Sequence, residues 1–237
     1  MNEWEYRIEE TFKRERIELN EKQVEQFRVY GEFLSAYNEK VNLTAIRDPQ
    51  EVIDAHFVDS LAARHLPELV ENAGCADVGT GAGFPGVPLA IARPDITVTL
   101  IDSLKKRLVF LDELKEKLRL DNIVTLHGRG EDLAHDTRYR ERFDCVLSRA
   151  VARLNVLCEL DVPFLRCGGR LLAWKGPAFA EEAEEAKHAL KTLGASVETV
   201  YSEKMEMRSH FIVVIRKDKP TPSRYPRRAG TPKRSPL

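Results

Sequence analysis

The residues whose types and spacing could do chemistry are concentrated in one glycine-rich stretch, 77–86, with the sequence DVGTGAGFPG. Gly79, Gly81, Gly83 and Gly86 lie between an apolar segment and the apolar run 87–92, a pattern that predicts a strand, a tight turn and a helix. Glycine allows positive φ and close approach of the backbone to a ligand, and a helix N-terminus offers free N–H groups. The stretch therefore predicts a site for a nucleotide-like ligand.

By itself this stretch is compatible with two enzyme classes. Residues 81–86 also fit G-x-G-x-x-G, the dinucleotide pattern of oxidoreductases that use a nicotinamide cofactor. Three features favour S-adenosylmethionine and methyl transfer. The chain ends in a predicted antiparallel hairpin, which is usual for methyltransferase folds. Asp77 suits a methionine ammonium better than a pyrophosphate, and we find no general acid system for a dehydrogenase.

Other polar residues follow the later predicted strands, and ligands of parallel sheets bind at the carboxyl ends of strands. Asp102 ends the second strand, where a carboxylate accepts hydrogen bonds from ribose hydroxyls. Gly130 and Glu131 follow the third strand and suit an adenine amino group. Arg149 ends the fourth strand and Lys175 the fifth, so both are predicted at the same edge.

The elements that must position these residues alternate from residue 73 onward. Predicted strands cover 75–78, 96–102, 123–127, 143–148 and 170–175, with helices at 86–93 and 103–119 between them. Strands 196–202 and 210–217 have only a short connection and pair most simply as a hairpin. We predict an α/β fold of class I methyltransferase type: a seven-stranded, mostly parallel sheet with a C-terminal antiparallel hairpin and an N-terminal helical extension.

The first 66 residues are predicted as a helical cap, followed by a methyltransferase domain over 67–218 and a basic, proline-rich tail over 219–237. Asn20 with Gln23, and Asp48 before Pro49, mark two helix starts. On the helix beginning there, His56, Asp59 and Ser60 share one face, so an aspartate contact could hold the imidazole in one tautomer. The alternative is a surface helix with a half-buried histidine.

Composition limits the other possibilities. A chain of 237 residues with 43% hydrophobic residues can bury the core of one full domain. The four cysteines have no C-x-x-C spacing, so we expect reduced thiols and no metal site. The apolar runs are short for a membrane span and no signal peptide precedes the helices, so we expect a cytoplasmic protein without a membrane partner.

The C-terminal segment is strongly basic although the net charge is only −1. From residue 216 onward eight Lys or Arg face a single Asp, and five prolines favour an extended chain that could lie along phosphates. Arg224, Arg227 and Arg228 are the candidate RNA contacts in it. A solvated, disordered tail is the alternative.

The stretch 77–91 resembles the signature of the glucose-inhibited division protein B family, the RsmG-type 16S ribosomal RNA guanine-N7 methyltransferases. Nearly the whole chain shares in the resemblance. The other similar segments are 42–46 (NLTAI), 56–61, Asp102-Ser103 with Lys106-Arg107, 148–152 (SRAVA), Lys175-Gly176 and 225–232.

The resemblance implies S-adenosylmethionine as methyl donor and a guanine near the decoding region of 16S ribosomal RNA as acceptor. By matching motif, Gly79 and Phe84 would line the cofactor site, Gly130 and Glu131 would meet the adenosine, and Arg149 would complete the pocket. Ser103 would also belong to the cofactor site, and Lys106 and Arg107 to the RNA-binding surface. This chain departs from the family at position 130, where it has glycine and the family often has alanine. The glycine would make the backbone less rigid there.

The residues agree with N7 as the methylated atom. The chain lacks an Asn-Pro-Pro-type motif after the fourth strand, which adenine amino methylation usually needs, and Cys145 lies inside a strand. Guanine N7 loses no proton when methylated, so positioning and electrostatics suffice. A cation, Arg149 or Lys175, would hold the guanine O6 while N7 stays free. Arg149 could instead serve the cofactor carboxylate alone.

We expect a monomer that acts on the small ribosomal subunit or an assembly intermediate. The remaining alternative outside the enzyme classes is a nucleotide-responsive, ribosome-binding protein without catalysis.

Overall fold

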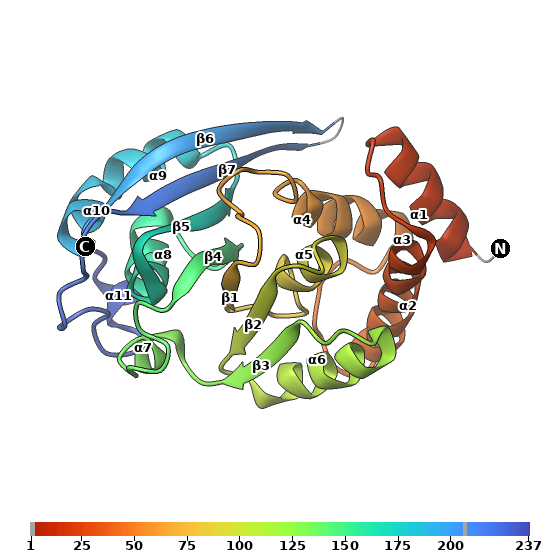
Figure 1. Ribbon diagram of the computed structural model, residues 1–237, viewed down its shortest axis with the longest axis horizontal. Coiled ribbons are helices and arrows are strands. Elements are labelled where there is room, and N and C mark those ends of the chain that lie inside the picture. Colours follow the sequence, from red (N-terminus) through yellow and green to blue (C-terminus); the bar gives the residue numbers. More distant parts are fainter. Residues whose placement is uncertain (1–2, 206–207) are drawn as a thin grey trace.

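The structure, a computed structural model, describes residues 3–205 and 208–237. Its centre is a seven-stranded sheet with the strand order β3-β2-β1-β4-β5-β7-β6 (Figure 1). The strand that precedes the glycine-rich stretch lies in the middle, because β1 pairs in parallel with both β2 and β4. The strands are β1 (Gly74–Val78), β2 (Thr97–Asp102), β3 (Ile123–His127), β4 (Phe143–Arg149), β5 (Leu165–Lys175), β6 (Ala195–Met205) and β7 (Arg208–Lys217).

The predicted C-terminal hairpin is confirmed. β7 runs antiparallel to both β5 and β6, whereas β1 to β5 pair in parallel. The apolar run at 212–215 explains why β7 lies inside the sheet: Ile212 and Val214 are buried on one face, and Val213 and Ile215 on the other. The predicted fold class is therefore confirmed by the topology.

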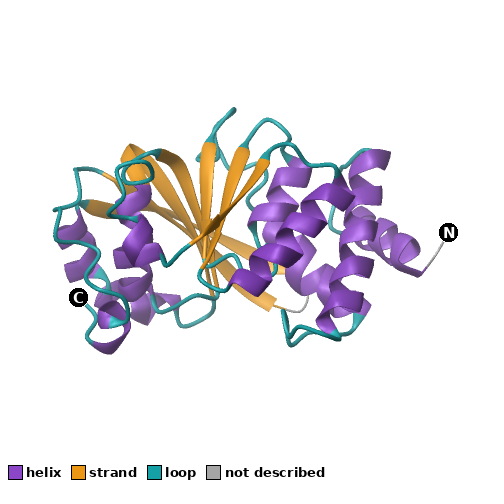
Figure 2. Ribbon diagram, turned by 90° about the horizontal axis from the view of Figure 1, so that it is seen from below, coloured by secondary structure: helices purple, strands orange, loops and turns teal. Residues whose placement is uncertain are grey.

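Helices cover both faces of the sheet, in the three layers that Figure 2 shows. One layer contains α1 (Glu3–Arg14), α2 (Glu21–Asn38), α3 (Pro49–Val52), the π-helix η1 (Ile53–Val58), α4 (Asp59–Leu61), α5 (Gly86–Ala92) and α6 (Lys105–Leu118). The other contains α7 (Gly130–Leu133), α8 (Leu154–Asp161), the 3-10 turn η2 (Val162–Phe164), α9 (Phe179–Glu185), α10 (Lys187–Leu193) and α11 (Thr231–Arg234).

The N-terminal helices share a hydrophobic core with one face of the sheet. Phe27 and Tyr30 of α2 are fully buried in the same cluster as the strand residues Leu100 and Leu147. The helix starts are confirmed: Asn20 and Gln23 form a reciprocal capping box, and the Asp48 side chain accepts the Glu51 N–H at 2.9 Å. Residues 3–66 thus pack in one layer together with α5 and α6, and the boundary at residue 66 stays a prediction.

The C-terminal segment is folded against the second layer, which corrects the expectation of an extended arm. The Arg140 guanidinium donates to the carbonyls of Thr221 and Tyr225, each at 2.8 Å. The Thr221 N–H donates to Glu141 Oε1 at 2.9 Å, and the Tyr225 side chain is buried. The five prolines of the segment predicted an extended chain. In the structure the segment is instead held against the protein by the buried Tyr225 side chain and by the Arg140 guanidinium, which donates to its carbonyls.

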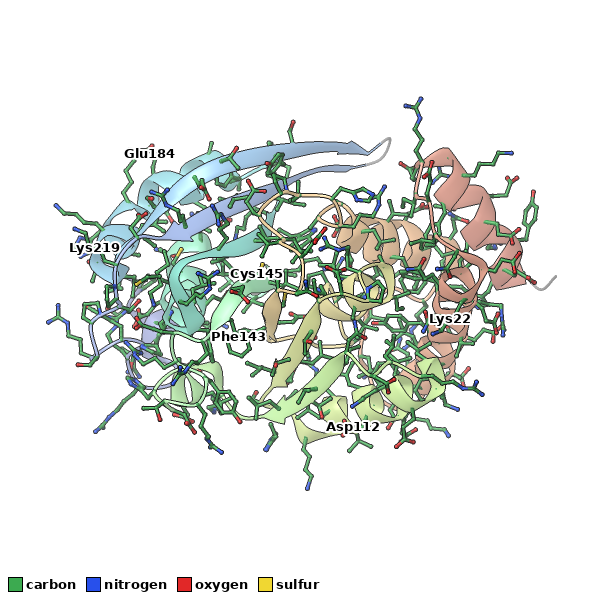
Figure 3. All side chains as sticks on the ribbon, viewed as in Figure 1. Lys22, Asp112, Phe143, Cys145, Glu184 and Lys219 are labelled. Atoms are coloured by element: carbon green, nitrogen blue, oxygen red, sulfur yellow. The ribbon has the colours of Figure 1, made fainter. Side chains whose placement is uncertain are left out.

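Cys145 lies within β4 among core side chains, as Figure 3 shows, and three of the four cysteines are buried. All four are free thiols in the structure. In the part of the chain that the structure describes, no helix is long and apolar enough to cross a membrane.

Candidate active site

The glycine-rich stretch forms the turn between β1 and α5, and its backbone needs the glycines. Gly79, Gly81 and Gly83 have φ of 74°, 61° and 100°, a region that residues with a Cβ rarely adopt. Asp77 closes the turn, since its Oδ2 accepts the Thr80 hydroxyl and the Gly86 N–H, both at 2.8 Å. Burial raises the pKa of the Asp77 carboxyl to about 6. The carboxylate predicted beside the ligand thus also shapes the loop.

A first cavity, of about 190 Å³, opens beside this turn at the carboxyl ends of β1, β2 and β3. We call it the donor cavity, and its lining includes Gly79, Asp102, Ser103, Gly130 and Glu131. These predicted cofactor residues are brought together. The remaining lining residues are Val78, Ile101, Arg107, Gly128, Arg129, Val151 and Leu160.

Asp102 is buried at the floor of the donor cavity and is heavily hydrogen-bonded. Its carboxylate accepts the N–H groups of Gly81 at 3.1 Å and Leu104 at 2.8 Å. It also accepts Arg107 at 3.0 Å, so this arginine lies on the donor cavity, although the sequence placed it with the RNA contacts. These three donors fix the direction of the Asp102 carboxylate.

The other five predicted cofactor residues do not line the donor cavity: Asp77, Gly81 and Gly83 belong to the turn itself, and Phe84 and Arg149 lie elsewhere. Phe84 is buried and stacks on Tyr30, with ring centroids 5.3 Å apart, and on His56, with centroids 4.4 Å apart. The Arg149 guanidinium also lies over the Phe84 ring, with its carbon 5.1 Å from the centroid. Phe84 therefore supports the groups that line a second cavity.

This second cavity, of about 280 Å³, lies on the other side of the β4–α8 loop, and we call it the acceptor cavity. Its lining is Ile46, Ala55, His56, Asp59, Arg149, Ala150, Trp174, Lys175 and Gly176. It joins the ends of β4 and β5 with the π-helix, the wide turn that aims His56 at Arg149.

Arg149 is the centre of the acceptor cavity. Its Nη1 donates to Asp59 Oδ2 at 2.8 Å and to the Ala55 carbonyl at 2.9 Å. Its Nη2 lies 3.1 Å from His56 Nδ1, and because a guanidinium can only donate, that nitrogen accepts. The other ring nitrogen, Nε2, then carries the proton and donates to Thr44 Oγ1 at 2.9 Å. His56 and Asp59, which share a helix face, are thus linked to each other by Arg149 from a distant strand.

Lys175 lines the acceptor cavity, but its ammonium already has partners inside the protein. Its Nζ donates to the Ala152 carbonyl at 2.8 Å and forms an ion pair with Glu182 of α9. The sequence missed Glu182, and it missed Thr44 and Trp174 as site residues. Thr44 falls in the segment 42–46 that carried the family resemblance, and this was the signal that could have found it.

The predicted RNA contacts separate into two groups. Lys106, Arg224 and Arg228 are exposed. Arg227 instead donates from its backbone and its guanidinium to Glu159, a fully buried carboxylate. Within the described residues no cluster of three or more His, Cys, Asp or Glu could hold a metal ion.

Comparison with known proteins identifies the family. The family model for GidB, described as rRNA small subunit methyltransferase G, matches residues 23–212. The chain belongs to the GidB family. Curated relatives named ribosomal RNA small subunit methyltransferase G include one from Desulfitobacterium hafniense, 49% identical over 96% of this chain and 95% of the relative. Another, from Desulforamulus reducens, is 43% identical over the full length of both chains.

Solved structures resemble this GidB protein in fold alone. An O-methyltransferase from Bacillus cereus in complex with SAH has a TM-score of 0.56 and 16% identity, and the match covers 80% of this chain and 90% of that one. TYW2 from M. jannaschii in complex with AdoMet has a TM-score of 0.52 and 16% identity over 67% and 76% of the two chains. Family and fold together confirm the predicted enzyme class, an S-adenosylmethionine-dependent methyltransferase, over a nicotinamide oxidoreductase.

Proposed function

We propose that this GidB-family protein transfers the methyl group of S-adenosylmethionine to N7 of a guanine in 16S ribosomal RNA, near the decoding region. The observation that carries the proposal is the pair of adjoining cavities at one edge of the sheet. One is lined by the carboxylates of Asp102 and Glu131, and the other by the guanidinium of Arg149. Carboxylates suit the hydroxyls and amino group of a nucleoside donor, and a cation suits guanine O6.

The donor cavity would hold the adenosine. Of the residues that line it, Asp102 and Ser103 would meet the ribose, and Glu131 with the backbone of Gly130 would meet the adenine. Gly81 and Gly83 shape the turn that leads to the methionine part of the donor, whose ammonium would meet Asp77. The Gly130 backbone lies against Val78, because a Cβ at this position would come within 3.2 Å of Val78 Cγ1. Glycine thus lets the backbone at position 130 lie closer to Val78 than a residue with a Cβ would.

In the acceptor cavity we assign the contact with guanine O6 to Arg149. Two cations were predicted for this contact, and one of them, Lys175, already donates to the Ala152 carbonyl and pairs with Glu182. Asp59 and His56 hold the Arg149 guanidinium in a buried position, its side chain only 12% exposed, so its direction is set before substrate arrives. No base is required, because N7 has a free in-plane lone pair.

RNA outside the pocket would contact the exposed cations Lys106, Arg224 and Arg228, since phosphate contacts supply most of the affinity and position the substrate. We propose that the protein acts as a monomer in the cytoplasm, on the small subunit or on an assembly intermediate of it.

The test is to map methylated guanine in 16S ribosomal RNA by mass spectrometry. RNA from cells with the gene, without it, and with an Arg149→Met variant would be compared. We expect one guanine to gain a methyl group at N7 only with the active gene. An unchanged methylation map in cells without the gene would reject the proposal. Methylation at N1 or at an amino group would reject N7 as the acceptor.

A further inference from the structure

Residues 150–152, in the short loop between β4 and α8, separate the donor cavity from the acceptor cavity. Ala150 lines the acceptor cavity and the next residue, Val151, lines the donor cavity. Val151 also lies over the glycine turn, because its Cγ2 would be 3.3 Å from a Cβ at Gly79. The position of this loop therefore decides how far the two cavities stand from each other.

The loop needs contacts from outside to keep its shape. Ala150 has φ of 57°, a left-handed conformation that is unfavourable for a residue with a Cβ. On its N-terminal side, the loop is fixed by Arg149 through the Ala55 carbonyl and Asp59. On its C-terminal side, the contacts come from β5 and α9.

Those contacts centre on Lys175. Its ammonium donates to the Ala152 carbonyl at 2.8 Å and pairs with Glu182, whose Oε2 also accepts the N–H of Leu154 at 2.8 Å. Leu154 is the first residue of α8, so one ion pair holds both the end of the loop and the start of the helix. The Lys175 and Glu182 side chains are only 7% and 15% exposed, which limits screening by solvent.

We propose that Lys175 is a positioning residue, which fixes the 150–152 loop through Ala152 and Glu182 and so sets the separation of methyl donor and guanine. The inference rests on the proposed function, in which the two cavities take those two groups. Lys175 then affects the reaction without touching the RNA, and Glu182 is its functional partner. A displacement of about 1 Å at reacting atoms can slow a reaction about 100-fold.

The test compares Lys175→Met, Glu182→Gln and the double variant with the wild-type protein. The readouts are the affinity for S-adenosylhomocysteine, the affinity for unmethylated small-subunit particles without cofactor, and kcat and KM for methylation. Lys187→Met and Glu184→Gln are matched controls, because that pair joins the same residue types but is exposed on both sides. Glu182→Gln leaves Lys175 in place and keeps the test decisive if Lys175→Met does not fold.

A positioning role predicts that Lys175→Met and Glu182→Gln each lower kcat about 10- to 100-fold and weaken S-adenosylhomocysteine binding several-fold. Particle affinity stays unchanged, and the double variant is no worse than Lys175→Met because the residues act through one network. The inference is overturned if Lys175→Met weakens particle binding while Glu182→Gln and the control pair have no effect. Absence of methylation by the wild-type protein would instead reject the proposed function.

Discussion

At the scale of single residues, Arg149 shows how one side chain can join distant parts of a site. It ends a central strand, yet its partners Ala55, His56 and Asp59 all come from the N-terminal layer. A planar guanidinium can bind these partners in fixed directions and still present N–H groups to a cavity. Lysine at the same place would keep the charge and lose the geometry.

We therefore expect Arg149→Lys to lower kcat/KM for ribosomal RNA about 100-fold, because one well-placed hydrogen bond to developing charge contributes about 3 kcal/mol. The affinity for S-adenosylhomocysteine should change less than about threefold, since Arg149 lines the acceptor cavity. Calorimetry and steady-state kinetics measure the two effects. A large loss of cofactor affinity with normal RNA kinetics would show that Arg149 serves the cofactor carboxylate alone.

Asp77 predicts a pH dependence of cofactor binding. Burial raises the pKa of its carboxyl to about 6, so in the free protein it is partly protonated near that pH. A methionine ammonium beside it favours the ionised form and lowers this pKa. S-adenosylhomocysteine should thus bind more tightly as pH rises through 6, with release of a proton, and calorimetry in two buffers measures both. Asp77→Asn should bind more weakly and without this pH dependence.

The same shift makes a prediction for stability. The folded protein holds the Asp77 proton more tightly than the unfolded chain, whose carboxyl titrates near pH 4. The stabilising contribution is therefore complete below about pH 4 and is lost as pH rises through about 6, at a cost of about 3 kcal/mol for a shift of about two units. Denaturant unfolding of wild type and Asp77→Asn at several pH values measures this. The same change of unfolding free energy with pH in both proteins would contradict the prediction.

At the scale of elements, the C-terminal segment is a strap that closes the second layer. Its Arg227 pairs with Glu159, a fully buried carboxylate of α8, and its Gly230 N–H donates to Glu131 at the donor cavity. The strap thus connects Glu159 of α8 to the wall of the donor cavity. Removing residues 219–237 should destabilise the whole protein, so a truncated protein does not isolate the RNA contacts.

Point substitutions separate the two roles of the strap. Arg227→Met should destabilise the protein by about 3 kcal/mol, because Glu159 is left as a buried charge without its partner. The low end of the usual range applies since the Arg227 side chain is 27% exposed. The exposed Arg224→Met should change stability by less than about 0.5 kcal/mol and reduce the salt dependence of RNA binding. Denaturant unfolding and binding at two salt concentrations measure these effects, and equal stability of both variants would contradict the strap.

At the scale of the whole molecule, the N-terminal helices and the sheet are expected to unfold together. Phe27 of α2 is fully buried and packs against Phe12 and Phe57, with ring centroids 5.2 and 5.0 Å away. The cluster that contains these rings extends to the strand residues of the sheet. A layer that supplies one side of the shared core has little reason to fold by itself.

Phe27→Ala should accordingly lower the free energy of unfolding of the whole protein by about 3–5 kcal/mol, with one cooperative transition retained. Denaturant unfolding is followed by circular dichroism, which reports secondary structure, and by tryptophan fluorescence, which reports tertiary packing. Tyr6→Ala is the control, because this aromatic of the first helix is 52% exposed. Two separate transitions in either variant would show that residues 1–66 are an independent domain.

The sequence by itself was enough to predict the fold class, a seven-stranded, mostly parallel sheet with a C-terminal antiparallel hairpin. Apolar periodicity fixed seven strands and the hairpin, and positive φ at three closely spaced glycines could be inferred from residue type, because both are local properties of the chain. The rule that ligands lie after parallel strands selected Asp102, Gly130 and Glu131, and the structure brings all three to one cavity. The family resemblance, carried by segments 42–46 and 148–152 among others, was also a property of sequence alone.

The tertiary structure alone decided which charged side chains are exposed and which are paired inside the protein. Arg107, Lys175 and Arg227 all looked like free cations in the sequence, and all three have carboxylate partners: Asp102, Glu182 and Glu159. The partners of Lys175 and Arg227 come from other elements, and even the nearby Asp102 shows its role only in the folded turn. The physical reason is that ion pairing depends on distance and burial in space, and neither is encoded in local spacing along the chain.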